Sequence, residues 1–191
     1  MAILAAKWRV KYKGIFDIKA LYEYLYHWSQ EDGWFNGKDT DFNEVFHGQH
    51  EYPGGSKELW IWWRLDKVPN DSSYFKYELD LDWHAVPPFK DVEIVHNGKK
   101  LKLASCDLEM QLHARVVTDY NGTWGKHWLL KHFEAFYWKV LMKQQFEKQK
   151  LELYREAYRL QDIIKDYWRL YKGVEEDQAE AGFWPPGTIG E

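Results

Sequence analysis

Cysteine is nearly absent from this chain, since Cys106 is the single cysteine among its 191 residues. An intrachain disulfide is therefore impossible, and a reducing compartment is compatible with the sequence. We expect Cys106 to be a small buried residue on a strand rather than a nucleophile. The chain also lacks a phosphate-binding glycine loop, a Gly-x-Ser-x-Gly nucleophile motif and a Cys/His zinc spacing. These absences argue against an enzyme, and we predict no catalytic residue, no cofactor and no metal.

Long apolar runs are absent as well. No stretch approaches ~18 consecutive apolar residues, so the sequence predicts no membrane-spanning helix. The first six residues are too short for the apolar core of a signal peptide and have no basic flank before them. We therefore expect an intracellular protein, in the cytoplasm or in a virion, that is not secreted through a signal peptide.

Positive charge is not in excess either, because 26 Lys and Arg residues stand against 30 Asp and Glu residues. Five of the acids, and none of the bases, lie in the last 18 residues. Without those five, the rest of the chain carries 26 basic and 25 acidic residues, which argues against general nucleic-acid binding. We predict a single domain over residues 1–173, followed by an acidic, disordered tail over residues 174–191.

Aromatic residues are abundant instead, with 12 Trp, 13 Tyr and 10 Phe. Most of them follow the period of a strand or of a helix. The segment from Phe75 to Ala85 alternates most cleanly between apolar and polar residues, as a half-buried strand does. Strands are predicted over residues 7–13, 42–52, 59–65, 75–85, 92–96 and 99–116.

Turn residues predict how several of these strands end. Pro87-Pro88 indicates the end of one strand, because proline cannot donate a hydrogen bond to the ladder. Near residues 103–105 the apolar phase changes from odd to even, which indicates a bulge or a bend. Asn97-Gly98 predicts a two-residue hairpin. Its implied register places Ile94 opposite Leu101, Val92 opposite Leu103, and Glu93 opposite Lys102.

Two segments have helical periodicity. Asp17 is a good N-cap for a first helix, which Gly33 ends. The second helical region covers residues 126–172, as one helix or two, and ends at Gly173. We expect its later stripe to pack on the sheet rather than to form a coiled coil. The apolar stripe of the first helix is Ile18, Leu21, Leu25 and Trp28. The second region has an earlier stripe, Leu129, Phe133, Phe136 and Val140, and a later one, Leu153, Ala157, Leu160, Ile164, Tyr167 and Tyr171.

Together these elements predict an α+β fold, in which a curved antiparallel sheet of about six strands packs on a short N-terminal helix and a long C-terminal helix. Over residues 7–172 this order of elements resembles the helix-grip (START-like) folds, and the resemblance implies an apolar cavity between sheet and helix. The expected core contains Trp8, Tyr77, Leu79, Leu81, Leu108, Met110, Leu112, Phe133 and Phe136.

A second resemblance concerns the N-terminal pattern. The segment from Tyr12 to Asp17, followed by Leu21, Tyr22 and Trp28, resembles the opening of small uncharacterised proteins encoded in archaeal genomes. That group has no assigned activity, so the resemblance implies no site residue.

Two aromatic pairs are candidate contact sites. Trp60 and Trp62 share a strand face with charged residues, which suggests a surface covered either by another segment of the chain or by a partner. Phe183 and Trp184 precede a diproline in the acidic tail, as a docking peptide does, or the tail folds back on its own body.

Acidic residues form another candidate site. If their strands pair, the acids could form a cluster for acid–base chemistry or for a hard cation, and the alternative is the solvated face of an amphipathic sheet. His47 and His50 lie three apart on a strand and so point to opposite faces, which argues against a metal site. The acidic residues are Glu78, Asp80 and Asp82 on one strand, and Asp107 and Glu109 on another.

Three functions remain open on the sequence. The first is a non-enzymatic structural or assembly protein that self-associates or binds a protein partner, as a virion component does. The second is a carrier or sensor that binds an apolar small molecule in a cavity. The third is an enzyme that uses the acidic strand face.

Overall fold

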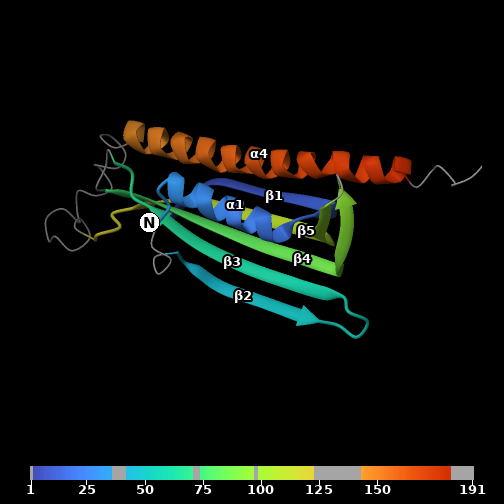
Figure 1. The fold of residues 1–191 in the computed structure, drawn as a ribbon. Helices are drawn as coiled ribbons and strands as arrows, with labels where there is room; N and C mark the ends of the chain where they lie inside the picture. The colour runs from blue at the N-terminus through green and yellow to red at the C-terminus, as the bar shows by residue number, and fades with distance from the viewer. Residues whose placement is uncertain (1, 36–41, 71–73, 97–98, 123–142, 182–191) are drawn as a thin grey trace, which may run out of the picture.

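The computed structural model describes residues 2–35, 42–70, 74–96, 99–122 and 143–181. The five strands form one antiparallel sheet in the order β1-β5-β4-β3-β2, which confirms the α+β class (Figure 1). In chain order the elements are β1 (Ala2–Phe16), α1 (Ile18–Glu31), β2 (Glu44–Glu51), β3 (Lys57–Lys67), β4 (Phe75–His96), β5 (Lys99–Thr118) and α4 (Lys143–Ala181).

The sheet has five strands in the described part of the chain, where the sequence predicts about six. The prediction is wrong at Pro87-Pro88, because β4 runs through these prolines to His96. The prolines interrupt only the ladder: the pairing of β4 with β5 shifts between Val86 and Lys90. A residue without an N–H leaves a local irregularity in a strand and need not end it.

The predicted hairpin register is confirmed. Ile94 lies opposite Leu101, Val92 opposite Leu103, and Glu93 opposite Lys102. The change of phase near residue 103 is also present, since the neighbours Leu103 and Ala104 are both buried. The shift of register lies on β4, however, since the pairing of β5 with β1 continues unbroken through this region.

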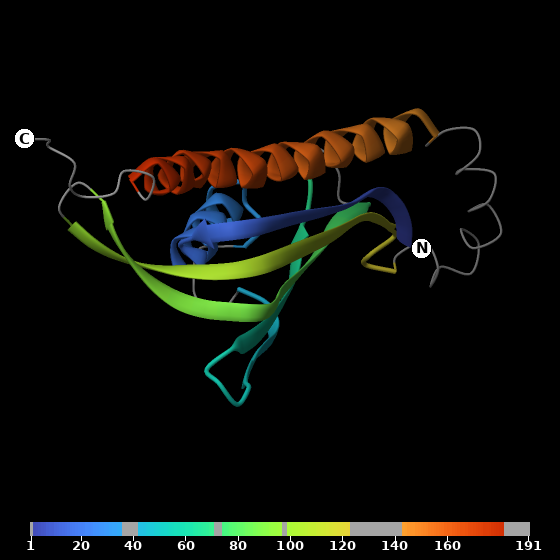
Figure 2. The same ribbon diagram turned by 90° about the vertical axis from the view of Figure 1, so that its right-hand side faces the viewer.

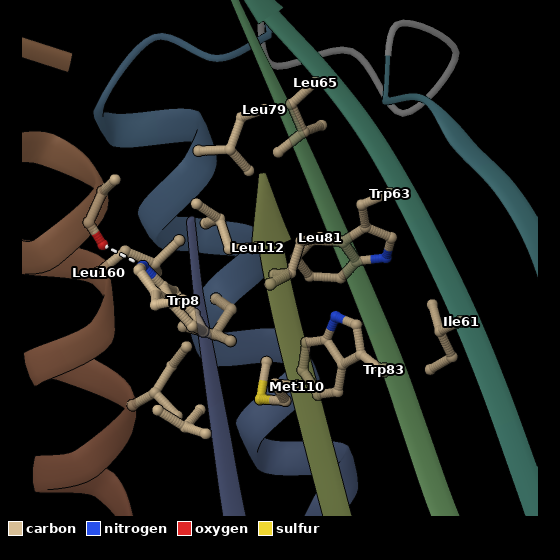
Figure 3. Close-up of a cluster of buried hydrophobic side chains, with 14 of the residues drawn as sticks. Trp8, Ile61, Trp63, Leu65, Leu79, Leu81, Trp83, Met110, Leu112 and Leu160 are labelled. Carbon is tan, nitrogen blue, oxygen red and sulfur yellow. Dashed lines mark hydrogen bonds between the residues drawn. The ribbon is translucent and has the colours of Figure 1, made fainter. Parts of the chain in front are cut away.

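Both helices lie on one side of the sheet, which we call the inner face (Figure 2). Leu153, Ala157, Leu160 and Ile164 of α4 are fully buried, so the helix packs on the sheet as predicted. The Trp8 indole N–H donates to the Ala157 carbonyl oxygen over 2.8 Å and joins β1 to α4 (Figure 3). The core also contains Tyr77, Leu79, Leu81, Leu108, Met110 and Leu112, as predicted, whereas Phe133 and Phe136 lie outside the described residues.

The N-terminal helix has the predicted start. The Asp17 carboxylate accepts a hydrogen bond from the Ala20 N–H at 2.9 Å, so Asp17 is the N-cap of α1. Gly33 follows the end of the helix with a φ of 75°, a left-handed conformation that glycine adopts without strain.

The C-terminal helix does not end where the sequence predicts. It continues through Gly173 to Ala181, because a single glycine costs a helix only about 1 kcal/mol relative to alanine. Residues 174–181 of the predicted tail are therefore helical, while the remaining tail lies outside the described residues. The part of the helical region before residue 143 also lies outside them.

Candidate binding surface on the outer sheet face

Trp60 and Trp62 point away from both helices, toward the side of the sheet that we call the outer face. Their neighbours in the strand, Leu59, Ile61 and Trp63, are buried on the inner face, and side chains alternate along a strand. Neither α1 nor α4 covers the two tryptophans, and Trp62 remains 39% exposed. The sequence left open whether a helix covers this pair, and the described helices do not.

Register places further rings beside these tryptophans. Phe46 of β2 lies opposite Trp62, and their ring centroids are 4.6 Å apart. His84 of β4 lies opposite Trp60 and stacks on it at 5.5 Å with an interplanar angle of 13°. Phe46 is 41% exposed, and Tyr52 just after β2 is 38% exposed. We call these five residues the aromatic patch: Phe46, Tyr52, Trp60, Trp62 and His84.

Glu58 holds one end of the aromatic patch in place. The Tyr52 hydroxyl donates to its carboxylate over 2.6 Å, and a ring nitrogen of His84 lies 2.7 Å from it. The hydrogen bond from Tyr52 and the contact with His84 lower the pKa of Glu58 from its usual value. The same hydrogen bond raises the pKa of Tyr52, because it favours the protonated hydroxyl. Glu58 is thus an orienting anion in this surface.

The acids of β4 are paired with arginines. Arg64 lies 2.6 Å from the Asp82 carboxylate and 3.6 Å from Asp80, and Arg115 lies 2.6 Å from Asp80. Arg115 also approaches Glu78 at 3.5 Å. Two guanidinium groups therefore neutralise much of this acidic row, as on the solvated face of an amphipathic sheet.

The acids of β5 do not join those of β4, although the two strands pair. Glu109 lies opposite His84 and forms ion pairs with Arg9 and Lys11 of β1. The hydrogen bond from Arg9 is the main cause of the lowered pKa of Glu109. Asp107 lies opposite Val86, so neither acid faces an acid of β4 across the ladder.

The other sequence candidates supply no second site. His47 and His50 alternate along β2, and in the described ranges no three His, Cys, Asp or Glu side chains are grouped so as to hold a metal ion. Phe183 and Trp184 lie outside the described residues. Cys106 is buried, and burial raises the pKa of its thiol to about 12, so it is protonated at neutral pH.

Two pockets flank the start of α1 on the inner face. One, of about 250 Å³, has an apolar lining that includes Ile18, Leu59 and Phe89. It is below the ~300–1,000 Å³ of typical small-molecule sites. The other, of about 480 Å³, is lined mostly by charged residues. Beneath α4, where the resemblance to helix-grip folds implied an apolar cavity, Leu153, Ala157, Leu160 and Ile164 are buried in the core.

Comparisons with known proteins add no relative: the sequence matches no protein-family model, no curated protein and no solved structure. Neither α1 nor the described length of α4 has the length and apolarity that crossing a bilayer requires.

Sequence reasoning found Trp60 and Trp62 but missed Phe46, Tyr52 and His84. The missing information is the register between strands, because the patch exists only where β2, β3 and β4 lie side by side. The sequence signal for β2 was that Phe46 and Tyr52 lie an even number of positions apart and so share one strand face.

Proposed function

We propose that this protein is a non-enzymatic assembly protein that binds a protein partner through the aromatic patch on its outer sheet face. The observation that carries this proposal is the exposure of Phe46 and Trp62 side by side on the face that the described helices leave uncovered. Exposed aromatic groups rimmed by polar residues are characteristic of interaction sites.

The composition of the surface favours a protein partner. Aromatic side chains dominate the energetics of protein interfaces, and Trp and Tyr are enriched among hot spots. The polar rim of this patch holds both signs of charge, with Glu58 beside His84 at one end and Asp82 paired with Arg64 at the other. Carboxylates at this position disfavour a nucleic-acid backbone, which requires a basic surface.

The patch is also held in shape before binding. Glu58 fixes Tyr52 and His84, and His84 supports the Trp60 ring from one side. A surface whose side chains are already ordered loses less conformational entropy on association, which favours affinity.

The test is the double change Trp60→Ser with Trp62→Ser. Leu170→Ser on α4 is the matched control, since Leu170 is 74% exposed and lies outside the patch. Immobilised wild type and control should retain the same partner from an extract of the source cells, and the double variant should lose at least ten-fold of this binding. Ten-fold corresponds to about 1.4 kcal/mol, less than one hot-spot residue contributes.

Circular dichroism of all three proteins separates lost binding from lost fold. The proposal requires a native spectrum for the double variant. If the double variant unfolds, the two tryptophans belong to the core. If it stays folded and retains every partner, the patch does not bind them.

A further inference from the structure

β1 and β2 are the two edge strands of the sheet. β1 contains three lysines, which discourage strand pairing, and it packs against α4, to which Trp8 is hydrogen-bonded. At the β2 edge, no strand of the described ranges pairs with the side of β2 that faces away from β3 (Figure 1). Six of the eight residues of β2 are exposed.

The backbone groups on this open edge can be assigned. The Tyr52 N–H donates to the Ser56 carbonyl oxygen at 2.7 Å, so Tyr52 faces β3. Backbone groups alternate in direction along an antiparallel strand, so His50, Gly48 and Phe46 also face β3. His47, Gln49 and Glu51 therefore direct three N–H and three C=O groups outward. Val45 lies in the irregularity between Glu44 and Phe46 and does not extend this row.

This edge has little protection against pairing. Natural edge strands are commonly blocked by lysine or proline or covered by another segment, and β2 contains neither residue type. An outward row of unsatisfied backbone groups is the template on which another strand adds.

We propose that β2 pairs antiparallel with β2 of a second copy of this chain, about a two-fold axis through Gln49. The outward backbone groups of β2 belong to odd-numbered residues in both copies. A hydrogen-bonded pair between the copies therefore joins one odd-numbered residue to another. With three outward residues, all of them pair only if the axis passes through the middle one. Each of the three pairs then exchanges two hydrogen bonds, so six hydrogen bonds join the copies.

The side chains agree with this register. Gln49 meets the partner's Gln49, and His47 meets the partner's Glu51 on the inner face, so no like charges are opposed. On the outer face Phe46 meets the partner's Tyr52, an aromatic pair. Moving the axis to His47 sets two histidines opposite each other and brings Gln49 against the irregular Val45. The register centred on Gln49 is therefore favoured.

Pairing in this way joins the two five-stranded sheets into one and makes their outer faces continuous. The aromatic patches of the two copies then meet across the axis, since Phe46 and Tyr52 belong to both the patch and the edge. The inference rests on the proposed function for the role in assembly, and deepens it by naming a second copy of this chain as a partner. The contact between the copies is the β2 edge of the sheet.

Cysteine cross-linking tests the register directly. Across the two-fold axis the Gln49 Cα atoms would lie ~5.5 Å apart, within disulfide range. His47 and the partner's His47 are four residues out of register, so they lie ~13 Å apart. The same separation applies to Glu51 and the partner's Glu51. Under mild air oxidation Gln49→Cys should form a cross-linked dimer. His47→Cys alone and Glu51→Cys alone should not, whereas a mixture of these two variants should, because residue 47 of one copy lies opposite residue 51 of the other. Cross-linking of His47→Cys alone, or of none of the four samples, overturns the register.

Sedimentation tests the association without cross-links. Wild type and Gln49→Thr, which keeps the N–H, should sediment at twice the chain mass of 23.1 kDa at high concentration. Gln49→Pro, which removes an outward donor and leaves the bonds to β3, should sediment at the mass of one chain with a native circular dichroism spectrum. A wild-type monomer, or a folded dimeric Gln49→Pro, overturns the inference.

A misfolded Gln49→Pro leaves Gln49→Lys as the second variant, because it sets two lysines opposite each other across the two-fold axis, where like charges repel. A folded dimer of Gln49→Lys again overturns the inference. The Trp60→Ser/Trp62→Ser protein separates this inference from the proposed function. If that protein remains a dimer but loses its partner, the edge and the patch both act as proposed. If it keeps its partner while Gln49→Pro becomes a monomer, the edge inference stands and the proposed function fails.

Discussion

Leu112→Ala should destabilise the fold by about 3–4 kcal/mol. Leu112 has no exposed surface, and on β5 it lies between Trp8 of β1 and Leu81 of β4, facing the helices (Figure 3). Removing its buried methyl and methylene groups loses about 2 kcal/mol of transfer free energy at ~0.8 kcal/mol each. A residual cavity of ~60 Å³ adds about 1.5 kcal/mol at ~24 cal/mol per Å³.

Urea unfolding followed by tryptophan fluorescence measures this loss, with the requirement that the slope against denaturant stays unchanged. For a chain of this size the midpoint of thermal unfolding should fall by roughly 6–16 °C. Leu101→Ala on the same strand is the matched control, because Leu101 is 38% exposed and its loss should cost less than about 1 kcal/mol. The reasoning is refuted if Leu112→Ala loses less than about 1 kcal/mol, or no more than the control.

Two further predictions concern titratable groups. Burial, and then the hydrogen bond to Glu44, raises the pKa of the Tyr22 hydroxyl. Because the folded state holds this proton more tightly than the unfolded state, stability is fully present below pH ~10 and falls as the pH rises further. The urea midpoint of Tyr22→Phe, measured from pH 9 to 11, should fall less than that of wild type; parallel curves would contradict this. Cys106 is buried, and burial raises the pKa of its thiol to about 12. It should therefore react with a thiol reagent at neutral pH only at the rate of unfolding. Immediate reaction in native buffer would show that the site is open.

Much of the architecture could be predicted from local patterns. The alternation from Phe75 to Ala85 gives a strand with one buried face, and Asn97-Gly98 fixes the hairpin register because few other residues adopt its turn. The stripe from Leu153 to Ile164 gives the buried side of α4. These signals depend on residues close together in the chain, where backbone geometry alone relates one side chain to the next.

Two predicted element ends are wrong because a residue that disfavours a strand or a helix did not end it. Pro87-Pro88 and Gly173 each predict an end, yet β4 and α4 continue through them. Neighbours on both sides of β4 hold it in the sheet, so the lost N–H bonds cost only a local shift in register. A local propensity of about 1 kcal/mol is a weak constraint beside such packing.

The sequence by itself determined which faces of its strands and helices are apolar, that Trp60 and Trp62 break the polar pattern of their strand, and that no disulfide can form. Only the tertiary structure decided what those tryptophans meet. It placed both helices on the inner face and brought Phe46 and His84 beside the pair. It also paired the acids of β4 with arginines and set those of β5 out of register with them. It left β2 as an edge strand of the sheet. Strand order and register depend on contacts between residues far apart in the chain, and no local period encodes them.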